Sequence, residues 1–196
     1  MKRQTAILAA ALSAAALGGA PGARGELVSV DANILLAEKF LGYHDWGPND
    51  RQGELGLLTN WQRRGWPVVI AADFLAASRE ASVGDVSYNN QQARTFELDL
   101  GARKLWTPVP SVRLFVGGGP SFMYAYLDNI TPSGNGVSRS TGEGVWLDAG
   151  LLWAFTQVFN IGIESRYSYG TVNLFGIGRN AGGLHIGLFG GYHFGG

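Results

Sequence analysis

The sequence predicts an all-β fold, an eight-stranded antiparallel up-and-down β-barrel. Three observations support this prediction. Apolar residues alternate with polar residues or glycine over eight segments, the connections alternate between long polar loops and short turns, and no run of 18 or more apolar residues occurs after residue 25. A period of two is the pattern of a strand whose faces differ. The 30 glycines also favour strands, since glycine costs about 1 kcal/mol per position in a helix.

Residues 1–25 form a separate segment ahead of the strands. Two basic residues precede an Ala- and Leu-rich run at 6–17, and small residues follow. This is the layout of a secretory signal peptide, and the apolar run is shorter than the ~20 residues of a transmembrane helix. We therefore expect a cleaved signal peptide over 1–25 and a barrel domain over 26–196. The small residues at 18–20 offer a second position for cleavage.

Composition excludes several classes of function. Without residues 1–25 the chain has 12 basic and 15 acidic residues, and no basic patch suggests binding to nucleic acid. With no cysteine in the chain there is no disulfide framework, thiolate zinc site or catalytic thiol. We expect no cofactor and no resident metal.

The first four predicted strands alternate apolar and polar positions. They cover Val28–Phe40, Glu54–Trp61, Val68–Ala77 and Phe96–Trp106, with polar loops at 45–50 and 78–92 and a short connection at 62–66. The alternation fails at Glu38, which a β-bulge or a position at the rim would explain. The segment Thr107–Ser111 contains two prolines and is predicted to lie outside the strands, because proline cannot donate to the ladder.

The last four predicted strands follow the same pattern. They cover Val112–Asp128, Val145–Phe155, Phe159–Tyr169 and Gly183–Phe194, with loops at 129–142 and 172–182 and a tight link at 156–158. Gly117–Pro120 is predicted to be a bend within its strand. A phosphate-binding loop is the alternative, but the Lys-Ser/Thr pair and the helix that should follow such a loop are missing. The last strand has an apolar face, and its other face carries histidines and glycines.

Aromatic residues gather at the two ends of the predicted strands. One group lies next to the short turns or the C-terminus: Trp61, Trp66, Trp106, Trp153, Phe155, Phe159 and Phe194. The other lies next to the long loops: Phe96, Tyr124, Tyr126, Tyr167 and Tyr169. Two girdles are typical of a barrel that spans a membrane, whereas a soluble lipocalin-like barrel or sandwich has no reason to segregate its aromatic residues.

The C-terminal strand resembles the assembly signal of bacterial outer-membrane barrels. Tyr192 and Phe194 end its apolar face, although Gly190 interrupts the pattern and two glycines follow. Over nearly its full length after residue 25, the chain resembles the eight-stranded barrels of the OmpA/OmpX type. The resemblance implies a monomer in the outer membrane, inserted by the barrel assembly machinery through its last strand. Its expected partners are outer-membrane lipids and lipopolysaccharide, with an unknown extracellular ligand for the loops.

Charged residues fall on the face that should point into the barrel. The predicted inward set is Glu54, Asp73, Glu97, Asp99, Asp148, Glu164, Arg103, Arg113 and Arg166. Buried charges must be paired, and eight strands leave a space that side chains can fill. We therefore expect a plug of ion pairs, with a narrow wetted channel as the alternative.

Catalysis is the other alternative, because some barrels of this size are hydrolases that act on lipid A through a Ser/His/carboxylate group. The chain has only three histidines and no His-x-Ser arrangement. His193 is predicted to lie at the periplasmic end. His44 and His185 are predicted near the outer end on neighbouring strands, where an acid/base or metal pair is conceivable, although two histidines are one short of a typical catalytic zinc set. The prediction is a non-enzymatic barrel with a structural or surface-binding role and no catalytic, cofactor or metal residues.

Overall fold

The computed structural model describes residues 28–82, 90–131 and 134–195, so the signal peptide predicted over 1–25 lies outside it. Its elements are β1 (Val28–Phe40), α2 (Tyr43–Trp46), η2 (Gly47–Asn49), β2 (Arg51–Arg63), β3 (Val69–Ser82), β4 (Asn90–Val109), β5 (Val112–Thr131), β6 (Gly134–Ala154), β7 (Phe159–Leu174), β8 (Ile177–Asn180) and β9 (Leu184–Phe194). Within these ranges no helix is long and apolar enough to cross a membrane.

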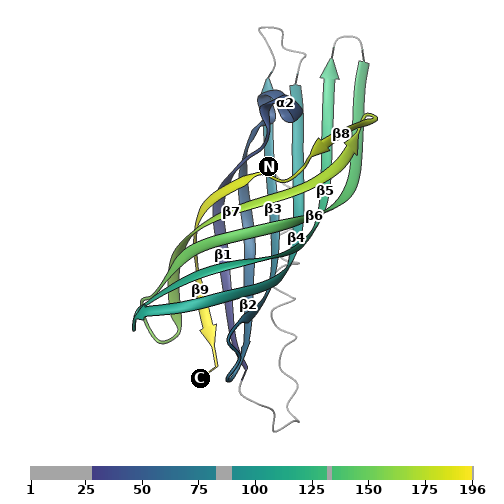
Figure 1. Cartoon of the computed structure of the whole chain (residues 1–196). Coiled ribbons are helices and arrows are strands. Elements are labelled where there is room, and N and C mark those ends of the chain that lie inside the picture. Colours follow the sequence, from purple (N-terminus) through teal and green to yellow (C-terminus); the bar gives the residue numbers. More distant parts are fainter. Residues whose placement is uncertain (1–27, 83–89, 132–133, 196) are drawn as a thin grey trace, which may run out of the picture.

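Eight strands close into one antiparallel barrel (Figure 1). Each strand from β1 to β7 pairs with the next, β9 pairs with β7, and β1 pairs with β9. The first and last strands are in register from Val30 opposite Phe194 to Phe40 opposite Leu184. The short strand β8 stands apart and pairs only with the end of β7. The predicted eight-stranded fold is confirmed, including the closure between the first and last strands.

The barrel has a shear number of ten. A row of outward residues that begins at Leu114 on β5 passes through one residue of each other strand and returns to β5 at Tyr124, ten residues farther along. Its members are Leu114, Leu151, Ile163, Leu188, Leu36, Leu55, Ala76, Phe96 and Tyr124. Eight strands with this stagger tilt strongly and enclose a space that side chains can fill. Figure 1 shows the tilt, because the strands at the front cross those at the back.

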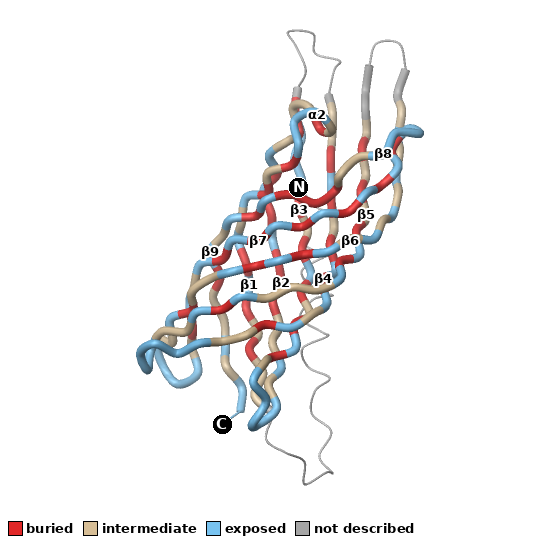
Figure 2. Tube along the Cα trace, in the orientation of Figure 1, coloured by how far each residue is buried: buried red, intermediate tan, exposed pale blue. Residues whose placement is uncertain are grey.

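Burial alternates along the strands, as Figure 2 shows. On β1, Leu35 is 2% exposed whereas Leu36 is 65% exposed. On β6, Leu147 is 66% exposed between buried Trp146 and buried Asp148. The exposed side chains include most of the large apolar residues of the strands, and the buried ones include ten charged residues. The facing predicted from the alternation is therefore confirmed at these positions.

The two ends of the barrel differ. One end, which we call the short-turn end, carries the turns at 64–68, 110–111 and 155–158 and the last residues of β9. The other, the long-loop end, carries α2, η2, β8 and the hairpin of β5 and β6. That hairpin extends beyond the barrel, because β5 and β6 pair as far as Thr131 and Gly134 whereas β6 and β7 pair only as far as Gly144 and Gly170.

Several segments predicted to be loops belong to strands. β3 extends to Ser82 and β4 begins at Asn90, so only 83–89 of the predicted loop 78–92 lie outside the described residues. The predicted loop 129–142 is mostly hairpin, and the predicted loop 172–182 contains the end of β7 and all of β8. The first two predictions were wrong because those segments are polar on both faces, whereas in 172–182 the alternation continues through buried Val172 and Leu174 and the predicted strand was ended too early. Alternation disappears once a strand leaves the apolar belt, but its ladder continues.

The proline-rich and glycine-rich segments also remain in strands. β4 continues through Pro108 to Val109, with a shift in register after Trp106, so the predicted stop is reduced to a two-residue turn. Pro108 is tolerated there because the ladder is ending at the rim. The pairing of β5 with β6 is unbroken through Pro120, and only the ladder with β4 is interrupted, at Leu100 and Gly101. The indole N–H of Trp146 donates to the Leu100 carbonyl at 3.1 Å.

Glu38 points outward without a bulge. The register of β1 is continuous with both of its neighbours, so the alternation places Glu38 on the outer surface, where it is exposed. Its cross-strand neighbours are Ile186 and Gly53. Among the residues that the structure describes, none forms an ion pair or hydrogen bond with Glu38. An unpaired carboxylate here faces whatever medium surrounds the apolar wall.

Replacing Glu38 with leucine should stabilise the barrel in a bilayer. A carboxylate on a lipid-facing surface costs less than a lysine or arginine, and we expect a gain of roughly 1–2 kcal/mol when it is removed. The measurement is the urea midpoint of the protein refolded in phospholipid vesicles. Glu80→Leu, at the end of β3, serves as the control and should have a smaller effect. An unchanged midpoint for Glu38→Leu would place this position outside the hydrocarbon.

The register between β1 and β9 can be tested with disulfides, since the chain has no cysteine of its own. Leu36 and Leu188 lie directly opposite each other. In L36C/L188C the Cα separation should therefore fall within the 4.4–6.8 Å or so that a disulfide requires. L36C/I186C is the diagonal control, with a separation beyond about 7 Å. We expect oxidation to cross-link the first variant and not the second, scored by the mobility of the unfolded chain in electrophoresis.

Candidate functional site

The barrel interior holds the charged residues in a definite order, which strand β4 shows by itself. From the long-loop end its inward residues are Ala93, Thr95, Glu97, Asp99, Gly101, Arg103 and Leu105. Together they belong to, or border, four groups of buried side chains. An apolar cluster comes first, then a cluster around Lys39 and His185, then one around two arginines, and finally a second apolar cluster.

The arginine cluster consists of Arg103, Arg166, Asp73, Asp99, Asp148 and Glu164. Asp73 accepts hydrogen bonds from both guanidinium groups. Arg166 also donates to Asp99 at 2.6 Å and to Glu164 at 2.8 Å, and Arg103 donates to Asp148 at 2.8 Å. All six residues are buried. Four carboxylates therefore surround two guanidinium groups, and formal charge in this cluster is negative.

Trp146 packs against both arginines. Its ring centroid lies 4.8 Å from the guanidinium carbon of Arg166 and 5.3 Å from that of Arg103. Glycine makes room for the ring, since a Cβ added at Gly101 would lie 2.8 Å from it. The contact combines cation–π attraction with the exclusion of water. The ring of Trp146 on β6 thus fills the space that Gly101 on β4 leaves open.

The lysine–histidine cluster consists of Lys39, Glu97, His185, Glu54 and Ser168. The ammonium group of Lys39 is fully buried and donates to Glu97, to Thr95 at 3.0 Å and to the carbonyl of Ala181 at 2.7 Å. His185 is 2% exposed, and its Nδ1 lies 2.8 Å from Oε2 of Glu54. Because both carboxylates and the ammonium group have hydrogen-bond partners here, burial is tolerated.

Ser168, His185 and Glu54 have the hydrogen-bond order of a serine-hydrolase triad. The Oγ of Ser168 lies 3.0 Å from Nε2 of His185, whose other nitrogen faces Glu54. Order alone does not make a catalytic group. Ser168 is fully buried, and its Oγ also accepts a hydrogen bond from the backbone N–H of Gly183 at 3.3 Å. The arrangement ties the segment before β9 to the wall and gives a substrate no visible approach to the hydroxyl.

Two apolar clusters enclose the charged ones. At the long-loop end the cluster consists of Leu41, Trp46, Ala93, Met123, Ala125, Leu127, Val172, Leu174 and Ala181. Toward the short-turn end it consists of Leu35, Leu58, Leu75, Phe115, Leu152 and Phe189. Glycines again provide the space, since a Cβ added at Gly150 or Gly162 would lie 2.3 Å from the ring of Phe115 or Phe189. The interior is thus packed with apolar side chains on both sides of its charges.

At the long-loop end, α2 is bonded to the last residues of β8. The indole of Trp46 donates to the carbonyl of Asn180 at 2.7 Å. The backbone N–H of Asn180 in turn donates to the carboxylate of Asp45 at 3.1 Å, and Arg179 donates to the carbonyl of Asp45. These contacts join two loops that are far apart in the sequence.

Most predicted inward charges lie in the two clusters. Eight of the nine are buried there, and the exception is Arg113, which is only partly buried and belongs to neither. Lys39 was missed, although continuing the alternation of β1 through Glu38 would have placed it inside. His44 and His185 do not meet: His44 lies on α2 with its side chain fully exposed, whereas His185 is buried. His193, near the short-turn end, lies 2.7 Å from Asp31.

No metal site is evident in the part of the chain that the structure describes, where no group of three or more His, Asp or Glu side chains is placed to hold an ion. The pair of histidines that the sequence suggested for such a site is separated. The Nδ1 of His44 lies 3.7 Å from Oδ1 of Asp45.

No protein-family model matches the chain, and a search of curated proteins found no relative. Solved structures do match. Neisserial surface protein A (NspA) has a TM-score of 0.57 and 13% identity, over 85% of this chain and 97% of its own. The chain has the fold of small outer-membrane β-barrel proteins. Ail of Yersinia pestis matches with a TM-score of 0.57 and 14% identity, over 87% of this chain and 100% of its own. OprG of Pseudomonas aeruginosa matches with a TM-score of 0.56 and 11% identity, over 88% of this chain and 98% of its own.

Proposed function

We propose that this protein is an integral barrel of the bacterial outer membrane, closed to solutes, that acts through its long-loop end as a surface-binding or structural element. The observation that carries the proposal is the distribution of polarity, since the barrel is apolar on its outer face and charged in its interior. Its outward face is apolar over the belt between the two aromatic ends, and its charges are paired inside. Such a wall is stable where the surroundings are apolar, and a closed barrel leaves no unpaired strand edge within them.

A plugged interior fits the packing better than a channel does. The two ion-pair clusters and the two apolar clusters follow one another along the axis, so that a solute would have to displace several of them. The negative formal charge of the arginine cluster implies that any water-filled path through the barrel interior would favour cations over anions. Planar-bilayer recordings of the refolded protein should show no stepwise conductance. Stable cation-selective steps would instead support the narrow channel.

Surface binding is supported by the exposed residues of the long-loop end. Tyr43 is 72% exposed on α2. Val137 is exposed on the hairpin of β5 and β6, Phe175 in the β7–β8 turn and Ile177 on β8. Apolar side chains at a solvent-facing tip are typical of interaction sites. A structure of Ail, with a TM-score of 0.56 to this chain and 13% identity over 87% of this chain and 100% of its own, holds the heparin analogue sucrose octasulfate. The ligand class for this chain stays open within the proposal.

Membrane location and orientation can be tested together with inserted epitopes. A tag after Gly176, in the β7–β8 turn, should be detected by antibody on intact cells. The same tag after Gly65, in the turn between β2 and β3, should be detected only after the outer membrane is permeabilised. Detection of both tags on intact cells, or of neither in the outer-membrane fraction, would contradict the proposal.

The hydrolase alternative has a direct test at Ser168. A fluorophosphonate probe labels activated serines, and we expect no labelling of the refolded protein because Ser168 is buried. Lipid A from cells that express the protein should likewise keep its mass. Labelling that disappears in Ser168→Ala, together with a loss of acyl mass from lipid A, would establish the enzyme instead.

A further inference from the structure

Residues 42–49, which we call the strap, join β1 to β2 at the long-loop end and contain α2 and η2 (Figure 1). Within the described ranges, the backbone–backbone hydrogen bonds of the strap all stay inside residues 41–50, so no β-ladder holds it to the barrel. Glycines flank α2, and Gly47 has a φ of 52°. A Cβ added at Gly47 would meet no atom within 4 Å. The strap therefore has room to move at this position, as a hinge requires.

Contacts that involve side chains fasten the strap to its neighbours. The Asp45 carboxylate accepts a hydrogen bond from the backbone N–H of Asn180 at 3.1 Å, and the Asp45 carbonyl accepts one from Arg179. On the other side, the Asn49 amide donates to the side chain of Gln91 at 3.3 Å. Two buried polar atoms at these contacts, Oδ1 of Asn49 and Nε of Arg179, have no hydrogen-bond partner among the described residues. Since such atoms cost free energy, the closed strap is incompletely bonded.

The indole of Trp46 is the part of the strap that enters the barrel. Trp46 is 2% exposed, whereas the first two residues of α2 are exposed. The ring packs in the apolar cluster at the long-loop end, where three small side chains leave space for it: Ala93, Ala125 and Ala181. Lys39, which is paired with Glu97, donates to the carbonyl of Ala181 at 2.7 Å. The space that holds the ring therefore ends at the lysine–histidine cluster.

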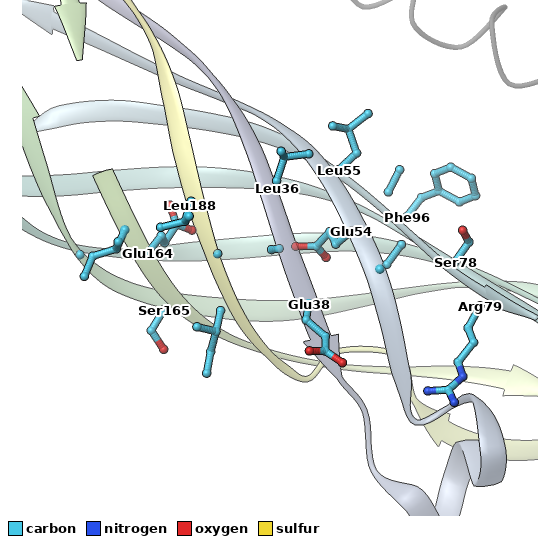
Figure 3. A pocket seen from close by; sticks show the side chains of 18 of the residues that line it. Leu36, Glu38, Glu54, Leu55, Ser78, Arg79, Phe96, Glu164, Ser165 and Leu188 are labelled. Atoms are coloured by element: carbon cyan, nitrogen blue, oxygen red, sulfur yellow. The ribbon is translucent and has the colours of Figure 1, made fainter. Parts of the chain in front are cut away.

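The ring occupies this space as a small molecule would. Its Nε1 donates one hydrogen bond, at 2.7 Å, to the carbonyl of Asn180, and the cluster around it is apolar. An enclosed apolar space with a few polar groups is the usual form of a small-molecule site. The hollow of about 1590 Å³ on the outer wall differs, since exposed Leu36, Leu55 and Leu188 project beside it (Figure 3). Trp46 is thus an internal occupant of an interior site.

We propose that the strap is an autoinhibitory lid, and that a planar aromatic molecule with one N–H donor displaces Trp46 from the apolar cluster. The inference rests on the proposed function, because the molecule reaches the strap from outside the cell. It takes over the apolar contacts of the indole and its hydrogen bond to the carbonyl of Asn180. Since the strap must open first, its side-chain contacts lower the apparent affinity, and a change that weakens them raises it.

The test uses the full barrel, refolded in detergent and labelled with 5-fluorotryptophan, with indole as the probe. The chain has six tryptophans, and Trp46→Phe identifies the fluorine resonance of Trp46. In the wild type, indole should move this resonance to a solvent-exposed position, shown by its sensitivity to deuterated water, and leave the others in place. Indene, which has nearly the same shape but no N–H, should bind roughly threefold to tenfold more weakly, the value of one hydrogen bond.

A variant of the strap tests the lid itself. Asp45→Ala should lower the indole concentration that displaces Trp46 about tenfold, because the strap loses its carboxylate contact with Asn180 and opens more readily. Asp128→Ala is the matched control, since it removes a partly buried carboxylate on β5 that accepts a hydrogen bond from Tyr126 at 3.4 Å. It should respond to indole as the wild type does.

Three results would overturn the proposal. They are a Trp46 resonance that indole does not move, equal effects of indole and indene, and equal responses of the two aspartate variants. The gel shift of the folded, unheated barrel separates these results from misfolding. The epitope test above reports on membrane location independently, so failure of the lid is distinguishable from failure of the proposed function.

Discussion

Replacing Arg166 with alanine is expected to destabilise the barrel by about 3–5 kcal/mol, the cost of leaving buried charges without their partner. Arg166 contacts Asp73, Asp99, Asp148 and Glu164, all of which are buried. Without it, Arg103 alone would face the four carboxylates. Equilibrium unfolding in urea, with the protein in phospholipid vesicles, measures the difference.

The control for this experiment is Arg63→Ala. Arg63 is exposed near the short-turn end, and removal of an exposed charge usually changes stability by no more than about 0.5 kcal/mol. If Arg166→Ala and Arg63→Ala unfold at the same urea concentration, the buried ion pairs do not hold the barrel together. The interior would then be better described as hydrated.

Arginine at Leu188 is expected to destabilise the barrel by roughly 2–4 kcal/mol in a bilayer, the penalty for a cation on the lipid-facing side near the midplane. Leu188 is 65% exposed at the middle of β9 and lies opposite Leu36 and Ile163. Its exposure means that the new side chain meets no steric conflict in the wall. The effect therefore reports on the medium outside the barrel.

Val137→Arg provides the comparison that decides between membrane and water. Val137 is 55% exposed, but it lies on the part of β6 that extends beyond the barrel. In a membrane protein this arginine should be nearly neutral whereas Leu188→Arg is costly. In a soluble barrel the two substitutions would have similar, small effects. The same urea titration as above measures both.

Alternation predicted the wall wherever one face of a strand is apolar. It placed Leu35 and Leu36 on opposite sides correctly, and it identified Asp73, Glu97 and Arg166 as interior residues. It failed beyond the apolar belt, where β5 and β6 continue as a hairpin with polar residues on both faces. Backbone pairing holds those residues in strands, and a side-chain pattern carries no signal for it.

The interior partners were harder to predict than the interior residues. Which acid meets which arginine depends on the shear, and a shift of one strand by two residues would change these contacts without changing any facing. Lys39 was not predicted to face the interior, for a different reason. Glu38 was taken as a break in the pattern, although it is an outward carboxylate in a regular strand. His185 meets Glu54 only because closure brings β9 beside β1, which pairs with β2 in turn, whereas Ser168 lies on β7, the other neighbour of β9.

The pairing of β1 with β9 has a consequence for the order of events during synthesis. The partners of Val30–Phe40 are Leu184–Phe194, the last strand to be made. No earlier segment can occupy that edge without displacing the native neighbour, so the first strand must wait for the whole chain. The barrel can therefore close only after β9 has been made, and until then the unpaired edge of β1 must be kept from pairing with other chains.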